Sequence, residues 1–333
     1  MTKKIHIPTG INMIAFTALM TAGMTSCEYK ELEEGSALTP VTIHFDWQEN
    51  LDSVPDAIPG SMRVAFYPVN DLARANMNKG YTFFDLPQSI WDATVQLPAG
   101  IYDVVAWNND TEHVLTDKYG SQKTLHATTP PYNSRGTFDT PTVLDSIYNG
   151  QRVLDYPDYM VHAINTEEEI FYGAKNQMIT LSPDSMVVTI EYKIHGIGGL
   201  SWVKQARGAV NNVAGKRFMA YDNLTEDAVA VMFDCNYNAE DGLLYGKFYV
   251  FGIEPTEMSN LTHKMVFFFW MDAGKVYLPL DVTKIFAAYR RDQSKIVIDI
   301  PSLNIDLRDY VTSKNTFDID LDDWDNVNID IGF

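Results

Sequence analysis

The sequence is short of basic residues and of cysteine. Its 333 residues hold 25 Lys and Arg against 44 Asp and Glu, which gives a formal net charge of -19. Such an excess of negative charge repels nucleic acid and anionic lipid headgroups, so neither is an expected partner. Because of this negative charge, any contact with a membrane must come from something other than a basic patch. The two cysteines, Cys27 and Cys235, stand far apart in the chain.

The sequence also lacks the motifs of common catalytic and cofactor sites. It has no HExxH, GxSxG or CxxC, and no glycine-rich phosphate loop followed by Lys and Ser or Thr. HGIGGLS has Gly196 and Gly198 in place for a dinucleotide fingerprint, but Ser201 stands at the third glycine position. The seven histidines are scattered, at positions 6, 44, 113, 126, 162, 195 and 263. We expect a protein that is not an enzyme, with no catalytic residue and no cofactor.

One acidic stretch, DIDLDD at residues 318–323, invites comparison with a calcium loop. Asp318, Asp320 and Asp322 have the spacing of the first three ligands, but Asp323 occupies the position where that loop needs glycine. The acids alternate with apolar residues, which favours a strand with an acidic outer face. We therefore expect no metal site, with a surface calcium site as the alternative.

No hydrophobic run near the start is long enough to span a bilayer. Lys3 and Lys4 precede an uncharged, mainly apolar stretch at residues 11–24, whereas a membrane-spanning helix needs about 20 such residues. A short positive start followed by a short apolar run is typical of a signal peptide. The sequence predicts that residues 1–26 are removed.

The residues around Cys27 resemble a bacterial lipobox. The small residues Thr25 and Ser26 come directly before the cysteine, and Met24 stands where leucine is usual. The resemblance implies that the Cys27 thiol carries a fatty acid such as palmitate and that the mature protein is anchored in the outer membrane by this lipid. Residues 27–40 then form an acidic tether, which is also similar to the export signal of Bacteroidota surface lipoproteins and so implies exposure on the cell surface.

An acylated Cys27 leaves Cys235 as the remaining thiol, so no disulfide within the chain is expected. Cys235 lies in the strand-like stretch FDCNYN. A lone cysteine in such a context is expected to be a buried small hydrophobic residue and not a nucleophile.

The periodicity from residue 41 onward is mostly that of β-strands. VTIHFDW at residues 41–47 alternates apolar and polar residues, and similar short runs follow, separated by Pro, Gly and Asn. The pattern predicts antiparallel sandwiches, with a boundary near Pro183 that separates an N-terminal sandwich at 41–182 from a C-terminal sandwich at 183–333.

Few segments have helical spacing. KIFAAYRR predicts a short helix, and SWVKQARGAVNNV, with Trp202, Ala206, Ala209 and Val213 at helical spacing, predicts another.

Aromatic residues and one long loop give the sequence its binding hypothesis. Residues 128–158 are rich in Pro, Asn and Asp and weakly periodic, which predicts a long surface loop of the kind that is often functional. Exposed aromatic rings can stack on sugars, although the same residues also fill sandwich cores. The candidates in or near loops are Trp91, Trp107, Tyr119, Tyr132, Tyr148, Tyr156 and Tyr159.

The segment LPAGIYDVVAWNND at residues 97–110 resembles a signature of Bacteroidales fimbrillin-like surface lipoproteins. Leu97, Pro98, Gly100, Tyr102 and Trp107 carry the match. The resemblance implies two tandem, antiparallel transthyretin-like Greek-key β-sandwich domains with few short helices.

The same resemblance implies a place in or under a fimbria, with fimbrial subunits as partners through strand addition or sandwich contacts. Polymerising subunits are cut after an arginine, yet here no arginine precedes Arg63, which lies inside a predicted strand. This favours an anchor or accessory subunit that keeps its lipid on Cys27. The alternative is a surface glycan-binding lipoprotein of a polysaccharide-uptake system.

Overall fold

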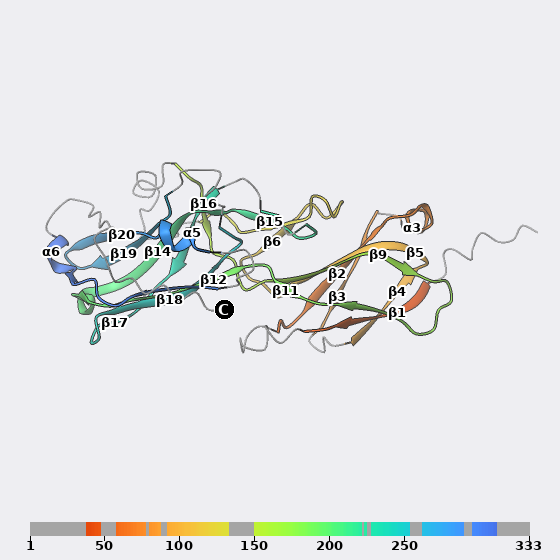
Figure 1. The fold of residues 1–333 in the computed structure, drawn as a ribbon, viewed down its shortest axis with the longest axis horizontal. Helices are drawn as coiled ribbons and strands as arrows, with labels where there is room; N and C mark the ends of the chain where they lie inside the picture. Colours follow the sequence, from red (N-terminus) through yellow and green to blue (C-terminus); the bar gives the residue numbers. More distant parts are fainter. Residues whose placement is uncertain are drawn as a thin grey trace, which may run out of the picture.

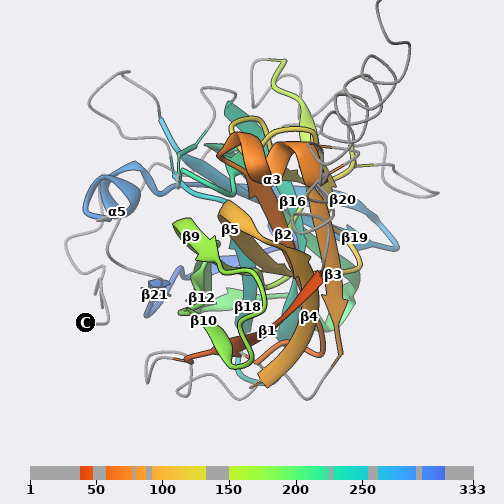
Figure 2. The same cartoon turned by 90° about the vertical axis from the view of Figure 1, so that its right-hand side faces the viewer.

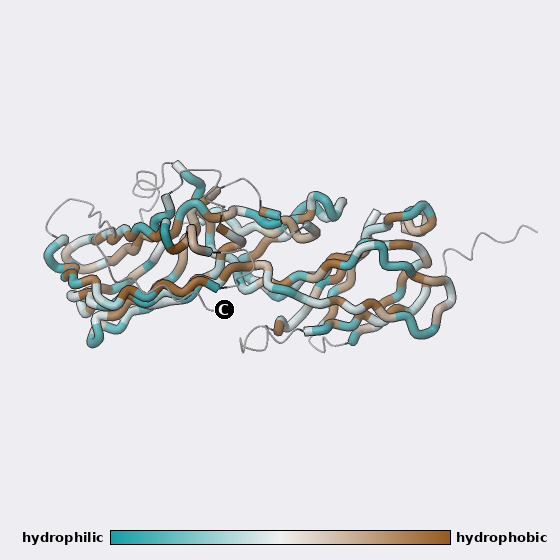
Figure 3. The backbone as a smooth tube through the Cα atoms, viewed as in Figure 1, coloured by the Kyte–Doolittle hydropathy of each residue, from teal (hydrophilic) through white to brown (hydrophobic). Residues whose placement is uncertain are grey.

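The structure is a computed structural model that describes residues 38–47, 58–77, 80–87, 92–132, 150–221, 223–224, 228–253, 262–289 and 295–311. The described chain consists mainly of strands, which form two sandwiches arranged end to end (Figure 1). Hydrophobic and hydrophilic residues alternate along many of these strands (Figure 3), so each sheet has one face for a core and one for solvent. The predicted all-β sandwich fold is confirmed.

The first sandwich packs a three-stranded sheet, in the order β10-β1-β4, against a five-stranded sheet, in the order β11-β9-β5-β2-β3. Figure 2 views the molecule from this end. Its core is made by alternate residues of both sheets, such as Val41, Ile43 and Tyr102. The strands are β1 Leu38–Phe45, β2 Met62–Pro68, β3 Thr82–Leu86, β4 Asp92–Pro98, β5 Gly100–Asn108, β9 Val161–Ile170, β10 Gln177–Leu181 and β11 Asp184–Ser185.

The second sandwich has a four-stranded sheet, β17-β18-β12-β21, and a five-stranded sheet, β20-β19-β14-β16-β8. Its core is rich in phenylalanine, and Phe233 stacks on Phe248 with ring centroids 3.8 Å apart. The strands are β8 Val153–Asp155, β12 Val188–Ile194, β14 Val203–Ala214, β16 Ala228–Asp234, β17 Asn236–Asn238, β18 Leu243–Val250, β19 Lys264–Met271, β20 Gly274–Asp281 and β21 Lys295–Ile300.

The two sandwiches share one strand arrangement. In the first, β1 pairs in parallel with β10 and antiparallel with β4. In the second, β12 pairs in parallel with β21 and antiparallel with β18. β1 and β12 are therefore central strands of their sheets, and alternate side chains of both are buried in the cores.

Shorter elements complete the fold. A small sheet, β15-β7-β6, lies where the sandwiches meet, and a two-stranded pair, β13-β22, lies beyond β12. The bounds are β6 Leu115–Asp117, β7 His126–Thr128, β13 Ile197–Gly198, β15 Lys216–Phe218 and β22 Ile305–Asp306. The helices are α3 Asp71–Asn76, the 3-10 helix η2 Leu200–Trp202, α5 Thr283–Ala287 and α6 Arg308–Val311. The helix predicted from KIFAAYRR is confirmed as α5.

The LPAGIY segment has a packing reason for its composition. Gly100 has a φ of +152°, and a Cβ built on it would lie 2.5 Å from the Cβ of Ala73 in α3. Only glycine therefore lets the chain pass this close to the helix. Tyr102 is fully buried and donates a hydrogen bond from its hydroxyl to the Pro98 carbonyl oxygen at 3.1 Å. The turn between β4 and β5 is fixed by these contacts.

The helix predicted from Trp202, Ala206, Ala209 and Val213 is wrong, because this segment forms the central strand β14. It pairs on one side with β16 and on the other with β19. The register shifts between Val210 and Val213, where Asn212 has a φ of +55°. Such a bulge interrupts the period of two, so apolar residues recur at intervals that mimic a helix.

The boundary predicted near Pro183, between 41–182 and 183–333, stays a prediction. Two short strands that precede it in the sequence pair with strands that follow it. β8 lies in parallel with β16 in the five-stranded sheet of the second sandwich, and β7 pairs with β15. The chain thus reaches the second sandwich through residues 113–132 and 150–157 before it returns to the first in β9.

Candidate functional site

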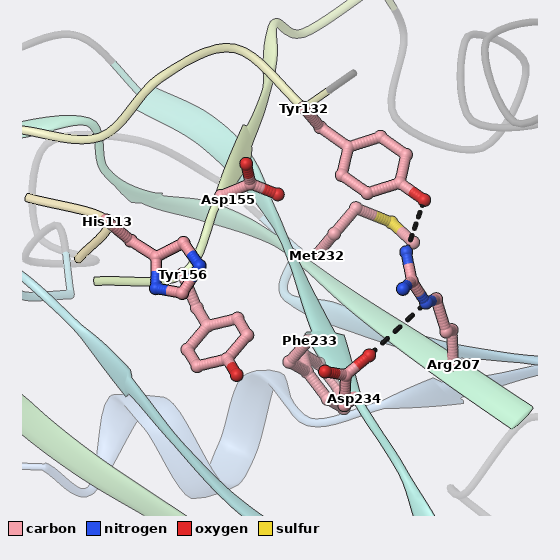
Figure 4. A pocket seen from close by; sticks show the side chains of 8 residues that line it. All are labelled: His113, Tyr132, Asp155, Tyr156, Arg207, Met232, Phe233 and Asp234. Atoms are coloured by element: carbon pink, nitrogen blue, oxygen red, sulfur yellow. Dashed lines mark hydrogen bonds and ion pairs between the residues drawn. The ribbon is translucent and has the colours of Figure 1, made fainter. Parts of the chain in front are cut away.

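A cavity of about 170 Å³ lies at the five-stranded sheet of the second sandwich, where β8, β14 and β16 run side by side (Figure 4). Four parts of the chain supply its walls: β14, the end of β16, the chain around β8, and His113, which precedes β6. The lining residues are His113, Tyr132, Asp155, Tyr156, Arg207, Met232, Phe233 and Asp234. Because β8 is held against β16, residues from the predicted long loop reach the same cavity as residues from central strands.

Arg207 forms one wall, and two contacts fix its guanidinium group. Its Nη1 donates a hydrogen bond to the Tyr132 hydroxyl at 2.6 Å, and its Nε lies 3.2 Å from a carboxylate oxygen of Asp234 (Figure 4). The guanidinium carbon also lies 5.7 Å from the centre of the Tyr132 ring. Arg207 and Asp234 face each other across neighbouring strands in register, so the sheet itself sets their separation.

His113 forms the opposite wall. Its backbone N-H donates to one oxygen of Asp158 at 2.6 Å, and its Nδ1 lies 3.0 Å from the other oxygen. The hydrogen bond with Asp158 raises the pKa of His113 above its ordinary value. The imidazole also stacks on Tyr156, with ring centroids 5.9 Å apart and planes at 28°. This wall therefore presents an aromatic surface whose orientation is fixed.

Asp155 lies between these two walls and is half-buried. Its backbone N-H donates to the Pro130 carbonyl oxygen at 3.1 Å. Its backbone carbonyl oxygen accepts from the Thr129 hydroxyl at 2.6 Å. Burial raises the pKa of the Asp155 carboxyl above its ordinary value, although His113 and Arg207 oppose this. Two apolar residues of β16 also line the cavity and are almost completely buried: Met232 belongs to the small cluster with Ala209, and Phe233 belongs to the main core.

A second cavity, of about 320 Å³, lies beside the first. Asp158 lines this second cavity and His113 lines the first, so the hydrogen-bonded pair stands between them. The other lining residues are Ile58, Pro59, Gly60, Asn108, Asp110, Thr111, Glu112 and Tyr159. Three carboxylates border this cavity, and none of its lining residues is Lys or Arg.

The aromatic residues predicted as a binding platform separate into different environments. Tyr132 and Tyr156 line the first cavity and Tyr159 lines the second. Trp107 is 1% exposed and belongs to the core at the junction, against which Tyr119 packs. Trp91 and Tyr148 lie outside the described residues.

Sequence reasoning did not identify the polar residues of the cavity. His113, Asp155, Arg207 and Asp234 come from four separate segments, and nothing in their spacing connects them. One signal pointed toward them, because residues 128–158 were singled out as a functional loop and contribute Tyr132, Asp155 and Tyr156. The convergence of the others depends on the pairing of β8, β14 and β16.

A second surface feature, the aromatic patch, consists of Arg63, Tyr81, Phe83 and Tyr119. Phe83 lies on the edge strand β3 and is 41% exposed, and the Tyr81 ring lies at 18° to the planes of both Phe83 and Tyr119. Arg63 covers Phe83, with its guanidinium carbon 4.3 Å from the ring centre, and forms two hydrogen bonds with Asp85 at 2.6 and 2.7 Å. The patch thus combines one exposed and two partly buried aromatic rings with a fixed guanidinium group.

Other predicted residues can now be located. Cys235, predicted to be a buried small residue, is partly buried and packs against the main core of the second sandwich, and this burial raises the pKa of its thiol above the ordinary value. Cys27, the predicted signal peptide and the acidic stretch at 318–323 lie outside the described residues. Among the residues that the structure describes, no three His, Cys, Asp or Glu side chains are placed to hold a metal ion. None of the described helices is long and apolar enough to cross a membrane.

The sequence is similar to a curated protein from Bacteroides ovatus with the name "Putative fimbrium anchoring subunit Fim4B". The two are 29% identical over 128 residues, which make up 38% of this chain and 35% of the relative. The matched part thus spans about a third of the length of that relative.

Solved structures from the same genus share the fold. A "putative adhesin" from Bacteroides ovatus aligns with a TM-score of 0.56 and 18% identity, over 84% of this chain and 99% of that one. A Bacteroides thetaiotaomicron structure described as "putative polysaccharide binding proteins (DUF1812)" aligns with a TM-score of 0.50 and 12% identity, over 80% of this chain and 92% of that one. At these identities the likeness concerns the fold.

These comparisons confirm the resemblance to Bacteroidales fimbrial surface proteins that residues 97–110 suggested. A family profile described as "Domain of unknown function (DUF5119)" matches residues 26–234, which is more than half of the chain. The chain therefore belongs to the DUF5119 family.

Proposed function

We propose that this protein is a non-enzymatic surface lipoprotein that acts as an anchor or accessory subunit of fimbriae. The observation that carries the proposal is its similarity to a protein named as a fimbrium anchoring subunit. The lipobox-like residues before Cys27 support it, because an anchor must remain attached to the outer membrane.

The first sandwich gives independent support for an anchor or accessory role. In the fimbrillin-like family that residues 97–110 resemble, a polymerising subunit loses a strand after cleavage at an arginine. Here Arg63 lies in β2, which is hydrogen-bonded to β3 on one side and β5 on the other. Proteases bind extended backbone that is free of such pairing, so Arg63 is a poor cleavage site. The strand before it, β1, is the central strand of its sheet, with Val41, Ile43 and Phe45 fully buried.

Fimbrial subunits are the proposed partners, through strand addition or sandwich contacts. The aromatic patch is the contact surface that we favour, since Tyr and Arg are enriched among residues that dominate protein interfaces. It adjoins β3, whose outer edge is not paired with any described strand. An edge strand can accept a partner strand through backbone hydrogen bonds, while Phe83 and Tyr81 would supply side-chain contacts.

The polysaccharide-uptake alternative has less support. The curated relative is named for fimbria anchoring, and the structure described as polysaccharide-binding shares only the fold at 12% identity.

The test is recovery of partners from the native outer membrane. We expect the full chain to co-purify with fimbrial subunits, to begin at an acylated Cys27, and to leave the membrane fraction when Cys27 is replaced by serine. Phe83→Ser should reduce the recovery of subunits, whereas Phe171→Ser, at a residue that is 56% exposed outside the patch, should not. A chain that begins beyond β1 and forms long polymers would overturn the anchor assignment.

A further inference from the structure

We infer that the cavity at Arg207 binds one neutral pyranose ring of a glycan. The inference rests on the lining of this cavity and does not depend on a fimbrial role. It adds a ligand site to a protein whose proposed partners are other proteins.

The cavity is small and has a partly apolar lining. Its volume of about 170 Å³ is well below the roughly 300–1,000 Å³ of pockets that enclose drug-sized ligands. A single sugar ring suits this volume better than a nucleotide or a peptide. Met232 and Phe233 contribute apolar atoms to its lining, and Tyr156 adds an aromatic wall. A pyranose has apolar C-H faces that pack on such surfaces.

The cavity is also lined by both hydrogen-bond donors and hydrogen-bond acceptors. Arg207 and His113 are nitrogen donors, and Asp155 and Asp234 are acceptors, so the wall offers partners for hydroxyl groups in both roles. Within the described part of the chain, no donor is found hydrogen-bonded to the Asp155 carboxylate, although the residue is half-buried. The carboxylate oxygens of Asp155 are therefore available to accept from a sugar hydroxyl, in the charge-assisted type of hydrogen bond that is stronger than a neutral one.

The charged side chains that line the cavity favour a neutral sugar over charged ligands. An anionic sugar would find Arg207 already paired with Asp234 and would face the carboxylate of Asp155. A cationic group would meet Arg207 on one side and His113 on the other, and hydrogen bonding to Asp158 favours the charged form of that imidazole. A neutral ring with several hydroxyl groups fits both walls without an unpaired charge.

The polar side chains of the cavity are pre-organised by their neighbours. The Tyr132 hydroxyl and Asp234 hold Arg207, and Asp158 holds His113, before any ligand arrives. Groups fixed in this way lose little conformational freedom on binding, which favours recognition of a small ligand.

The test is saturation-transfer NMR on the purified full chain, without fimbriae. The probes are the neutral methyl glycosides of glucose, galactose and mannose, with N-acetylneuraminic acid and glucosamine as charged comparators. We expect transfer to at least one neutral glycoside and at least tenfold weaker binding of it by Asp155→Asn, because a hydrogen bond to a charged group is lost. Asp71→Asn makes the same charge change on exposed α3 of the first sandwich and should bind as the original chain does.

An unchanged thermal unfolding transition would show that Asp155→Asn still folds. Arg207→Lys is the second variant, since it keeps the charge but loses the planar fork, and it should also weaken binding.

Absence of transfer to every neutral glycoside at about 50 mM, a concentration that detects millimolar affinity, would overturn the inference. So would equal binding by Asp155→Asn and Asp71→Asn, or a preference for either charged sugar. Loss of subunit recovery in the fimbrial test would leave these results unchanged, so the two proposals fail separately.

Discussion

His162 Nδ1 lies 2.8 Å from the carbonyl oxygen of Met219. His162 belongs to β9 in the first sandwich, and Met219 follows β15, which continues directly from β14 of the second. The two residues are 7% and 0% exposed. Arg217 of β15 makes a related contact, donating from Nη1 to the Met186 carbonyl oxygen at 2.8 Å. One buried and one partly buried polar contact thus join the two sandwiches in addition to the apolar junction core.

Replacement of His162 by leucine should lower the free energy of unfolding by about 1–3 kcal/mol, because a buried carbonyl group loses its partner. Urea unfolding followed by fluorescence measures the loss. His44→Leu is the matched control, since His44 makes a partly exposed contact with Asp92 that should contribute less than about 1 kcal/mol. An equal decrease in the free energy of unfolding in the two variants would show that the His162 contact contributes no more to stability than the partly exposed His44 contact.

Gly100→Ala should destabilise the protein by about 1–3 kcal/mol or more, because the new methyl group would overlap Ala73. The positive φ of Gly100 adds backbone strain to this overlap. Gly120→Ala is the control, since its φ is not positive and no atom lies within 4 Å of the added Cβ. A Gly100→Ala chain as stable as the Gly120→Ala chain would refute this account of the LPAGIY segment.

Much of the fold follows from the sequence because period-two alternation is a local signal. VTIHFDW forms most of β1, a strand where the pattern predicts one. β14 was missed because its regularity is broken at Asn211 and Asn212, whose side chains bond the Lys264 amide and the Thr262 carbonyl group on the neighbouring chain segment. Such a bulge is stabilised by residues some 50 positions away, so no local pattern shows it.

The cavity was less accessible to prediction than the fold. The loop at 128–158 was recognised as unusual from composition, but Arg207 and Asp234 are ordinary charged residues within strand segments. They become neighbours of Tyr132 only because β14 and β16 pair in one register and β8 joins their sheet.

Arg63 should resist an arginine-specific protease in the folded protein. Its strand is paired on both sides, and its side chain is held by Asp85 and Phe83. Brief digestion followed by mass spectrometry should therefore find no new N-terminus at Val64, whereas the same digestion in urea should produce one. Cleavage after Arg63 under native conditions would instead support removal of β1 and a stalk subunit.

The Cys235 thiol should react slowly with a disulfide reagent in the native state. Burial raises its pKa, so the thiolate fraction at pH 8 is smaller than for an exposed cysteine. In a full chain that carries Cys27→Ser, Cys235 is the single thiol. We expect release of the coloured thiol product to be at least tenfold faster in denaturant than in buffer. Equal rates would show that Cys235 is exposed and reactive.

Stability should decrease in mild acid through His263. This residue is 0% exposed, its ring lies 5.1 Å from Phe286, and among the described residues its Nε2 has no hydrogen-bond partner. Burial lowers the pKa of His263, although the Asn211 carbonyl group and Asp281 oppose this. The unfolded chain therefore binds a proton at a higher pH than the folded chain, so stability is lost as the pH falls from about 6.5 toward the lower folded-state pKa.

The expected loss from His263 is up to about 1.4 kcal/mol for each pH unit in that window. His113 has the opposite sign, since its pKa is raised and its stabilisation is lost as the pH rises through its folded-state value. Urea unfolding at several pH values between 7.5 and 5, compared with His263→Phe, isolates the effect of His263 because the variant retains His113. As the pH falls, the original chain should lose stability relative to His263→Phe, since phenylalanine occupies the same apolar site without binding a proton. Parallel curves would mean that His263 is protonated in the folded protein as easily as in the unfolded chain.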